Sequence, residues 1–253
     1  MAAPGPRDDF FIGYLDRMPG SLGWFLAATA SLLIAGFAAL GLALGVAVDD
    51  PGDGDFAWGL GPQRLTGVIE ASPYPVLRLP PDATHPRPRT IMLASPGKHG
   101  AQALAAGFQG RLVEATGVII KRGSLDMLQL DGGAALTPLE ASFTPAAPIA
   151  LGRWRLAGEI CDGKCYAGAM RPGRGLAHKA CANLCLLGGV PPVFVSAGPV
   201  EGVSFLLLAA PGSGPLPDDG RDFVALTIEV EGQIERLDDL LVFRADLATA
   251  GRR

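Results

Sequence analysis

The chain contains an internal repeat, and this repeat constrains its fold more than any single motif does. Residues 93–97, Leu-Ala-Ser-Pro-Gly, recur as Leu-Ala-Ala-Pro-Gly at residues 208–212, an offset of 115. The same offset, without a gap, relates five further identical pairs: Phe108 and Phe223, Glu114 and Glu229, Gly117 and Gly232, Ile119 and Ile234, and Asp131 and Asp246. We therefore expect two copies of one structural unit, at residues 60–143 and 150–247.

Each copy has the residue pattern of β-strands. Residues 226–235 alternate apolar side chains with Thr, Glu and Gln, a period of two that predicts a strand with one solvent-exposed face. In the first copy we expect a short helix within residues 100–108 and five strands, near residues 64–70, 74–79, 90–94, 111–121 and 125–131. Five strands with a helix between the third and fourth is the order of the OB-type barrel. The expected fold class is mainly β, with one N-terminal transmembrane helix followed by two tandem OB-like small β-barrels; a single β-sandwich is the alternative.

An uncharged segment precedes the repeat. No charged residue occurs from Trp24 to Val48, and at about 1.5 Å per residue this segment is long enough to cross the hydrocarbon layer of a bilayer. A secretory signal peptide has a shorter apolar region and ends in a small-residue cleavage site. We therefore expect an uncleaved transmembrane helix at residues 24–48.

The basic residues beside this helix predict its orientation. Arg7 and Arg17 precede the helix, whereas the first basic residue after it is Arg64. The bias towards Ala, Gly, Pro and Arg is typical of GC-rich bacterial genomes. The positive-inside rule therefore predicts a short cytoplasmic N-terminus at residues 1–23, a linker at 49–59, and a soluble domain on the periplasmic side of a bacterial inner membrane.

The second copy has a long segment that the first copy lacks. Five residues separate Ile69 from Pro75, whereas 31 separate Ile160 from Pro192, and all four cysteines of the chain lie among those 31. We expect this Cys-rich insert, residues 161–191, to connect the first and second strands of the second barrel and to contain a helix. Loops at this position of a barrel commonly carry the function.

Two disulfides are the first interpretation of the insert, because periplasmic cysteines are usually oxidised. Nested bridges, Cys161–Cys185 and Cys165–Cys181, would clamp the insert as a hairpin. The spacing, C-x3-C on each side of fifteen residues, resembles the twin C-x3-C hairpins of small mitochondrial translocase chaperones, in which nested bridges join two helices. The resemblance covers residues 161–185 alone.

A metal or cluster site is the second interpretation. On the expected helix His178, Cys181 and Cys185 share one face. Together with Cys161 and Cys165 they form a candidate ligand set for Zn²⁺, copper or an iron–sulfur cluster. A redox-active dithiol is the third interpretation, although neither cysteine pair has C-x-x-C spacing.

Several function classes have little support in the sequence. The net charge is −4 and no basic cluster occurs, which argues against nucleic acid as a partner. The chain has no P-loop, nucleophile elbow or dinucleotide-binding fingerprint, so an enzyme is the less favoured class.

Two functions therefore stand as predictions. The first is a membrane-anchored periplasmic binding or accessory module that docks on a membrane or periplasmic protein complex, with the insert as a disulfide-clamped contact surface. The alternative is a metal-, iron–sulfur- or other cofactor-binding protein in electron transfer or cofactor maturation, with the insert's cysteines and His178 as ligands. The layout of the alternative resembles that of the periplasmic haem chaperones of cytochrome c maturation, although no position matches their haem-attaching histidine motif.

Overall fold

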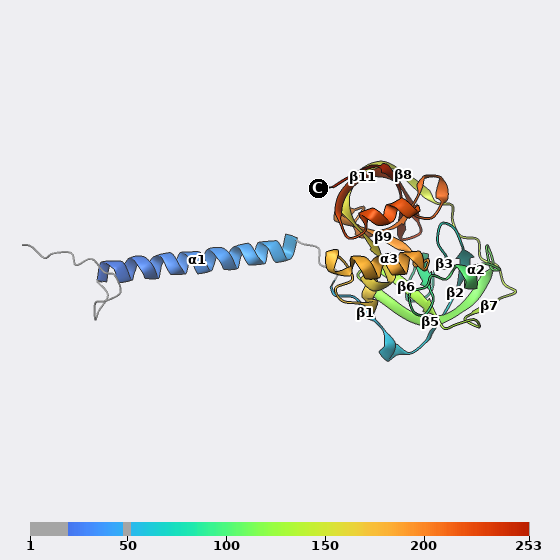
Figure 1. Ribbon diagram of the computed structural model, residues 1–253. Helices are drawn as coiled ribbons and strands as arrows, with labels where there is room; N and C mark the ends of the chain where they lie inside the picture. Colours follow the sequence, from blue (N-terminus) through green and yellow to red (C-terminus); the bar gives the residue numbers. More distant parts are fainter. Residues whose placement is uncertain (1–19, 48–51, 253) are drawn as a thin grey trace, which may run out of the picture. The chain divides into compact units, whose positions relative to one another are not determined.

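The computed structural model describes residues 20–47 and 52–252, and the chain divides into two compact units, Met1–Asp50 and Pro51–Arg253. The described part of the first unit is a single helix, α1, Gly20–Ala47 (Figure 1). It has no charged residue, and its 28 residues extend over about 42 Å. This helix is long and apolar enough to span a membrane. It begins four residues before Trp24, the expected start.

One polar side chain of α1, that of Thr29, is hydrogen-bonded within the helix, an arrangement that suits a lipid environment. The hydroxyl of Thr29 donates to the carbonyl oxygen of Phe25, one turn earlier, at 2.8 Å. Arg7 and Arg17, on which the predicted orientation depends, lie outside the described residues, as do residues 48–51 of the expected linker. The orientation stays a prediction.

The second unit is mainly β, and its first sheet contains seven strands. The order is β1-β5-β2-β3-β4-β6, with β7 on β5 and a further pairing between β5 and β6. β4 and β6 are parallel, and the other pairs are antiparallel. The elements of this part are β1 Asp55–Phe56, η1 Trp58–Leu60, β2 Gln63–Glu70, β3 Val76–Leu79, β4 Arg89–Ala94, α2 Gln102–Ala105, β5 Leu112–Arg122, β6 Leu125–Leu130 and β7 Leu136–Pro138. Five of these strands and α2 lie at the positions expected from the sequence.

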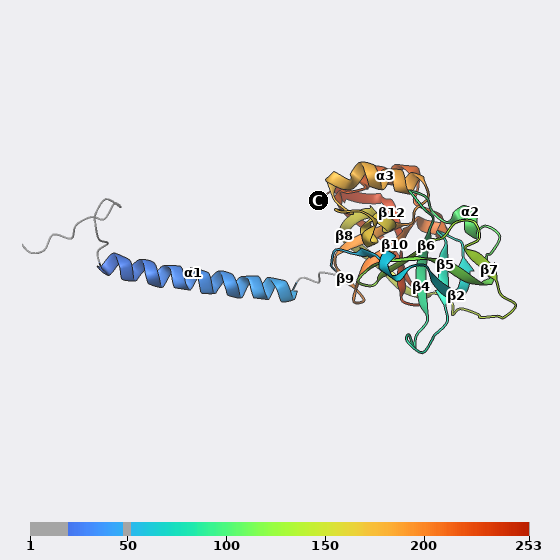
Figure 2. The same ribbon diagram turned by 90° about the horizontal axis from the view of Figure 1, so that it is seen from below.

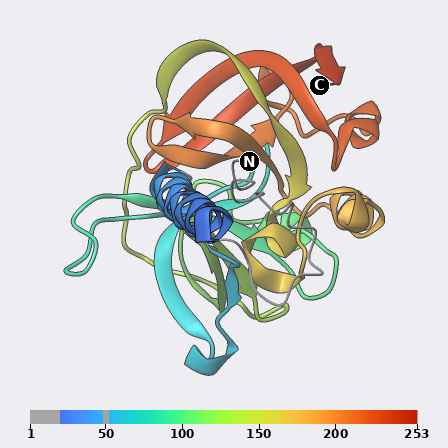
Figure 3. The same ribbon diagram turned by 90° about the vertical axis from the view of Figure 1, so that its left-hand side faces the viewer.

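The second sheet is a closed five-stranded barrel, in the order β10-β12-β11-β8-β9, with β10 and β12 parallel. Figure 3 shows its strands in yellow to red. Three helical segments lie between β8 and β9, and Figures 1 and 2 show the longest, α3, on the outside of the β-structure. The elements are β8 Ile149–Asp162, η2 Cys165–Ala169, η3 Leu176–His178, α3 Lys179–Leu187, β9 Pro192–Val200, β10 Val203–Ala209, η4 Pro211–Ser213, η5 Asp218–Phe223, β11 Thr227–Leu237 and β12 Leu240–Arg252.

Two glycines of the repeat occupy equivalent positions of close strand approach. A Cβ atom on Gly117 would lie 2.2 Å from the carbonyl oxygen of Gln129, and one on Gly232 would lie 2.4 Å from that of Arg244. Gln129 and Arg244 are themselves related by the offset of 115. The repeated glycines therefore have a packing reason, because any side chain there would collide with the backbone of the adjacent strand.

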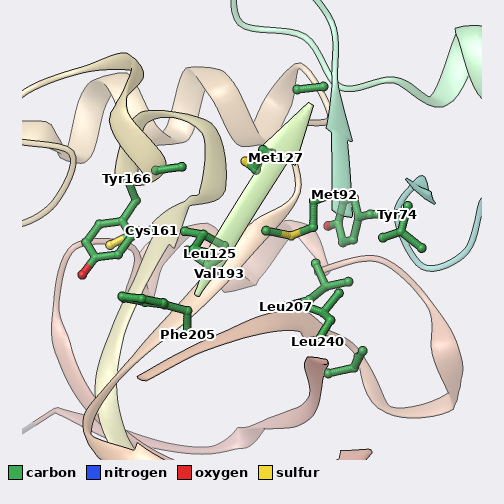
Figure 4. Packing of buried hydrophobic residues seen from close by; sticks show 14 of the residues in the cluster. Tyr74, Met92, Leu125, Met127, Cys161, Tyr166, Val193, Phe205, Leu207 and Leu240 are labelled. Carbon is green, nitrogen blue, oxygen red and sulfur yellow. The ribbon is translucent and has the colours of Figure 1, made fainter. Parts of the chain in front are cut away.

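The two sheets share a hydrophobic cluster. Met92 and Met127 of the first sheet, with Tyr74 between β2 and β3, pack with Cys161 and Phe205 of the second (Figure 4). Each sheet also has its own interior cluster. The shared cluster explains why residues 51–253 form one compact unit and not two separate ones.

A buried ion pair also joins the two sheets. The guanidinium of Arg78, on β3, donates to both carboxylate oxygens of Asp238, in the turn between β11 and β12, at 2.9 and 2.8 Å. The hydroxyl of Thr90 donates to the same carboxylate at 2.8 Å. Removing either charged partner would leave the other charge buried, so this pair helps to fix how the two sheets dock.

Candidate metal centre

Cys161 lies apart from the other cysteines. It is in β8, beside Asp162, and successive residues of a strand point to opposite faces. Its side chain is 1% exposed and packs in the shared cluster with Tyr166 and Phe205, as Figure 4 shows. Burial raises the pKa of the Cys161 thiol well above its ordinary value. Cys161 is therefore a core residue in this structure.

All four cysteines are free, so neither of the expected bridges, Cys161–Cys185 and Cys165–Cys181, is formed. The physical reason for the first is the strand alternation, which turns the Cys161 sulfur into the shared core and away from α3. The sulfurs of Cys165 and Cys185 lie 3.8 Å apart, in contact but not bonded. The two C-x3-C pairs thus do not act as a symmetric hairpin clamp.

The other three cysteines come together with two polar residues, and we call these five the thiol cluster: Asp162, Cys165, His178, Cys181 and Cys185. The sulfurs of Cys165 and Cys181 and a ring nitrogen of His178 all lie within 4.8 Å of one another. The same limit holds for the sulfurs of Cys165 and Cys185 and a carboxylate oxygen of Asp162. The two groups share Cys165, so three of the other predicted ligands, His178, Cys181 and Cys185, lie within 4.8 Å of its sulfur. Cys161 is absent from both groups, and Asp162 is added.

Asp162 organises this cluster from the end of β8. One of its carboxylate oxygens accepts a hydrogen bond from the backbone N–H of Cys165 at 2.8 Å, and the other lies 3.1 Å from Nε2 of His178. Asp162 is fully buried and His178 is 4% exposed. With the carboxylate ionised and the ring neutral, the carboxylate can only accept, so Nε2 of His178 carries the proton and Nδ1 keeps its lone pair. Metal-binding histidines are commonly held by such a carboxylate.

Two lysines place positive charge beside the sulfurs. Nζ of Lys98, from the loop after β4, donates to the sulfur of Cys181 at 2.7 Å and lies 3.8 Å from that of Cys185. This contact raises the pKa of Lys98. Lys164 is 4% exposed and donates to the carbonyl oxygens of Ser95 and Gly97, and burial lowers its pKa.

A glycine lets the Lys98 loop approach α3 closely. The backbone N–H of Gly100 donates to the carbonyl oxygen of Gly188, at the end of α3, at 2.9 Å. A Cβ atom on Gly188 would lie 1.8 Å from the carbonyl oxygen of Lys98, so no other residue fits there without a shift of the loop. The loop of the first sheet therefore forms one wall of the thiol cluster.

Cys165 and Cys185 form a buried, hydrogen-bonded pair. Their sulfurs lie 3.8 Å apart, and either thiol can be the donor. This contact raises the pKa of Cys165, and burial acts in the same direction, whereas the contact lowers the pKa of Cys185. Within the pair, loss of a proton is therefore favoured at Cys185, whose sulfur also lies 3.8 Å from Nζ of Lys98.

Three members of the site, Asp162, Lys98 and Lys164, were missed in the sequence. Asp162 and Lys164 lie between the two cysteines of the first C-x3-C pair. Lys98 was visible only as a difference between the copies, because position 213, its equivalent at the offset of 115, is Ser.

Comparisons with known proteins add no relative. No family model, curated protein or solved structure matches this chain. Its function is therefore inferred from the chemistry of the thiol cluster.

Proposed function

We propose that the protein is a membrane-anchored metal-binding protein that holds one Zn²⁺ ion, or a similarly soft ion such as Cu(I), through Cys165, His178, Cys181 and Cys185. The observation that supports this best is the convergence of three thiols and one imidazole, supplied by separate segments. Four such ligands complete a tetrahedral site and leave no open position for a substrate, so a structural or carrier role fits better than catalysis.

The spacing and the charges suit such an ion. Ligands about 2.3 Å from Zn²⁺ at the corners of a tetrahedron place two sulfurs about 3.8 Å apart, and Cys165 and Cys185 have that separation. Three thiolates and a neutral imidazole around Zn²⁺ leave one net negative charge, which the ammonium groups of Lys98 and Lys164 offset. Asp162 would hold His178 with Nδ1 towards the ion.

Metal binding is favoured here over the docking module with a disulfide-clamped contact surface. That prediction took the contact surface to be an insert clamped by two nested bridges, and all four cysteines are free. The free thiols, with a buried imidazole and two lysines beside them, support metal binding by the insert.

The wider organisation is part of the same proposal. We propose two OB-like barrels, because β2, β3, β4, β6 and β5 pair in the same cyclic order as β8, β9, β10, β12 and β11. In both sheets the parallel pair is the equivalent one, β4–β6 and β10–β12. The segment between β8 and β9 is then the insert. We place this soluble unit on the periplasmic side of the membrane, as the arginines before α1 predict.

The test is metal content in the full chain. Reduced protein purified in detergent is incubated with Zn²⁺ or Cu(I), freed of excess metal, and measured for bound metal by mass spectrometry. Wild type and C161A are expected to retain one equivalent, and C165A and C185A to lose it. C161A is the matched control, because it removes a buried cysteine of the same insert that lies outside the cluster. Reduced wild type that retains neither metal would refute the proposed function.

A further inference from the structure

Two of the four proposed ligands are also placed to bond to each other. The sulfurs of Cys165 and Cys185 lie 3.8 Å apart, and the side chains are 3% and 1% exposed. A disulfide needs an S–S distance of about 2.05 Å, so a movement of about 2 Å would bring the sulfurs to bonding distance. Cys165 is the first residue of η2, and the backbone of η2 is non-helical at Gly168. A small change in this short segment would move the Cys165 sulfur.

The third sulfur is placed to connect this pair to the solvent. Cys181 is only partly buried, whereas Cys165 and Cys185 are buried. Its sulfur lies within 4.8 Å of the Cys165 sulfur and contacts Nζ of Lys98 at 2.7 Å. Thiol–disulfide exchange proceeds by attack of one sulfur on another. Three neighbouring sulfurs can therefore transfer a disulfide bond from the partly buried Cys181 to the buried pair.

We infer that metal loading is controlled by a disulfide between Cys165 and Cys185 that forms through Cys181 by exchange with an external disulfide; this inference rests on the proposed metal site. A sulfur in a disulfide has no thiolate to offer a metal, so closing the bond removes two of the four ligands. The oxidised site then releases its ion, and reduction restores the ligand set.

The exchange balances in three steps. The Cys181 sulfur attacks a small-molecule disulfide RSSR, forming a mixed disulfide and releasing one RSH with the thiol's proton. The Cys165 sulfur then attacks the Cys181 sulfur, releasing the second RSH and forming Cys165–Cys181. Finally the Cys185 sulfur attacks Cys165 and returns Cys181 to a thiol. The net change is two thiols and RSSR to one protein disulfide and two RSH, a transfer of two electrons.

The experiment compares reduced and oxidised full-length protein in detergent. One sample is kept in a thiol reductant and the other is treated with oxidised glutathione in the presence of a chelator. Both are freed of reagents, and part of each is alkylated for intact mass. The remainder is incubated with Zn²⁺ and assayed for bound metal. We expect the reduced sample to bind one equivalent and the oxidised sample to lose two hydrogens and its binding.

Variants assign the bond. C181S retains Cys165 and Cys185 and is expected to lose the same two hydrogens more slowly, because the exposed sulfur is gone. C185S is expected to form no Cys165–Cys185 bond, and its peptides serve as the reference in fragment mass spectra. C161A is expected to respond to oxidation as wild type does, since its missing thiol belongs to the shared core.

The outcomes separate the two ideas. If the reduced sample binds Zn²⁺ and the oxidised sample binds it equally, or forms no Cys165–Cys185 bond, the inference is overturned while the metal site stands. If the reduced sample binds no metal, both are overturned, whatever bond the oxidised sample contains. Loss of binding on oxidation that C161A abolishes would also overturn the inference, because the relevant disulfide would then include Cys161.

Discussion

Asp162→Asn is the most informative single change, because it keeps the size of the side chain while it removes the charge and one of the two acceptor oxygens. The carboxylate of Asp162 now accepts from two groups, the backbone N–H of Cys165 and Nε2 of His178. An amide has one oxygen, so it accepts from only one of them and presents its NH₂ group to the other. If that NH₂ faces His178, the ring changes tautomer, and the proton moves to Nδ1, the nitrogen proposed to hold the metal.

The magnitude follows from the position of Asp162 behind His178. Loss of a group that orients a metal ligand typically weakens metal binding by about 10- to 100-fold, or about 1.4 to 2.8 kcal/mol. Asp162 is fully buried, so little solvent is available to replace its hydrogen bonds. In metal-free protein the same change is expected to lower the free energy of unfolding by about 1.5 to 3 kcal/mol, the value of hydrogen bonds to a charged group.

The assay is competition for Zn²⁺ between the reduced full-length protein and a chromophoric chelator. Asp218→Asn is the control, because Asp218 is 91% exposed in its side chain and pairs with Arg221 at the surface, where an ion pair contributes about 0 to 1 kcal/mol. If Asp162→Asn and Asp218→Asn both bind Zn²⁺ as tightly as wild type does, then Asp162 does not orient a metal ligand and the assignment of Nδ1 is refuted.

Three further predictions concern stability and the anchor. Burial raises the pKa of Cys161 above 9.0, so above that pH the folded protein retains a proton that the unfolded chain releases. The contribution of this thiol to the free energy of unfolding of reduced, metal-free protein is expected to fall there by about 1.4 kcal/mol per pH unit, in addition to that of Cys165, whose pKa is also raised. Chemical denaturation of C161A should show a flatter slope; equal slopes would contradict this. Gly117→Ala, whose Cβ would lie 2.2 Å from the Gln129 carbonyl oxygen, is expected to destabilise the fold by about 1 to 3 kcal/mol, whereas Gly107→Ala, with nothing within 4 Å, should stay within about 0.5 kcal/mol. Leu33→Arg, within α1, is expected to make membrane insertion less favourable by about 2.5 to 3.5 kcal/mol and to lower the membrane-bound fraction. Leu184→Arg, on α3, changes a similarly exposed leucine and should leave that fraction unchanged. A membrane-bound fraction unaffected by Leu33→Arg would argue against α1 as the anchor.

The strands were predictable because each depends on a local pattern. Alternation from Leu226 to Glu235 follows from one buried and one solvated face, and Ile228, Val230 and Ile234 are buried as that pattern requires. The repeat predicted equivalent strands. Gly117 and Gly232 show one feature that both copies preserve, the close approach of two adjacent strands. These features need only neighbouring residues and could be read from the chain.

The composition of the site was harder to predict, because it depends on directions and on distant segments. Helical spacing predicted that His178 and Cys181 share one face, and a ring nitrogen of His178 lies within 4.8 Å of the Cys181 sulfur. The sequence could not show towards which face of β8 each residue points. In the structure Cys161 points into the shared core, whereas Asp162 points to the thiol cluster. Lys98 is 83 residues from Cys181 in the chain, and no local pattern connects them.

The arrangement of the site suggests why the two copies differ. The second copy supplies Asp162 from the end of β8. It supplies the three sulfurs and His178 from the segment between β8 and β9, which the first copy lacks. The first copy supplies Lys98 and the carbonyl oxygens of Ser95 and Gly97 that hold Lys164. An insert with two buried thiols, one partly buried thiol and a buried lysine needs charge compensation and hydrogen-bond acceptors that it does not contain. The neighbouring copy provides both, so the insert and the loop after β4 are two halves of one site, and neither copy alone would be expected to hold the ion.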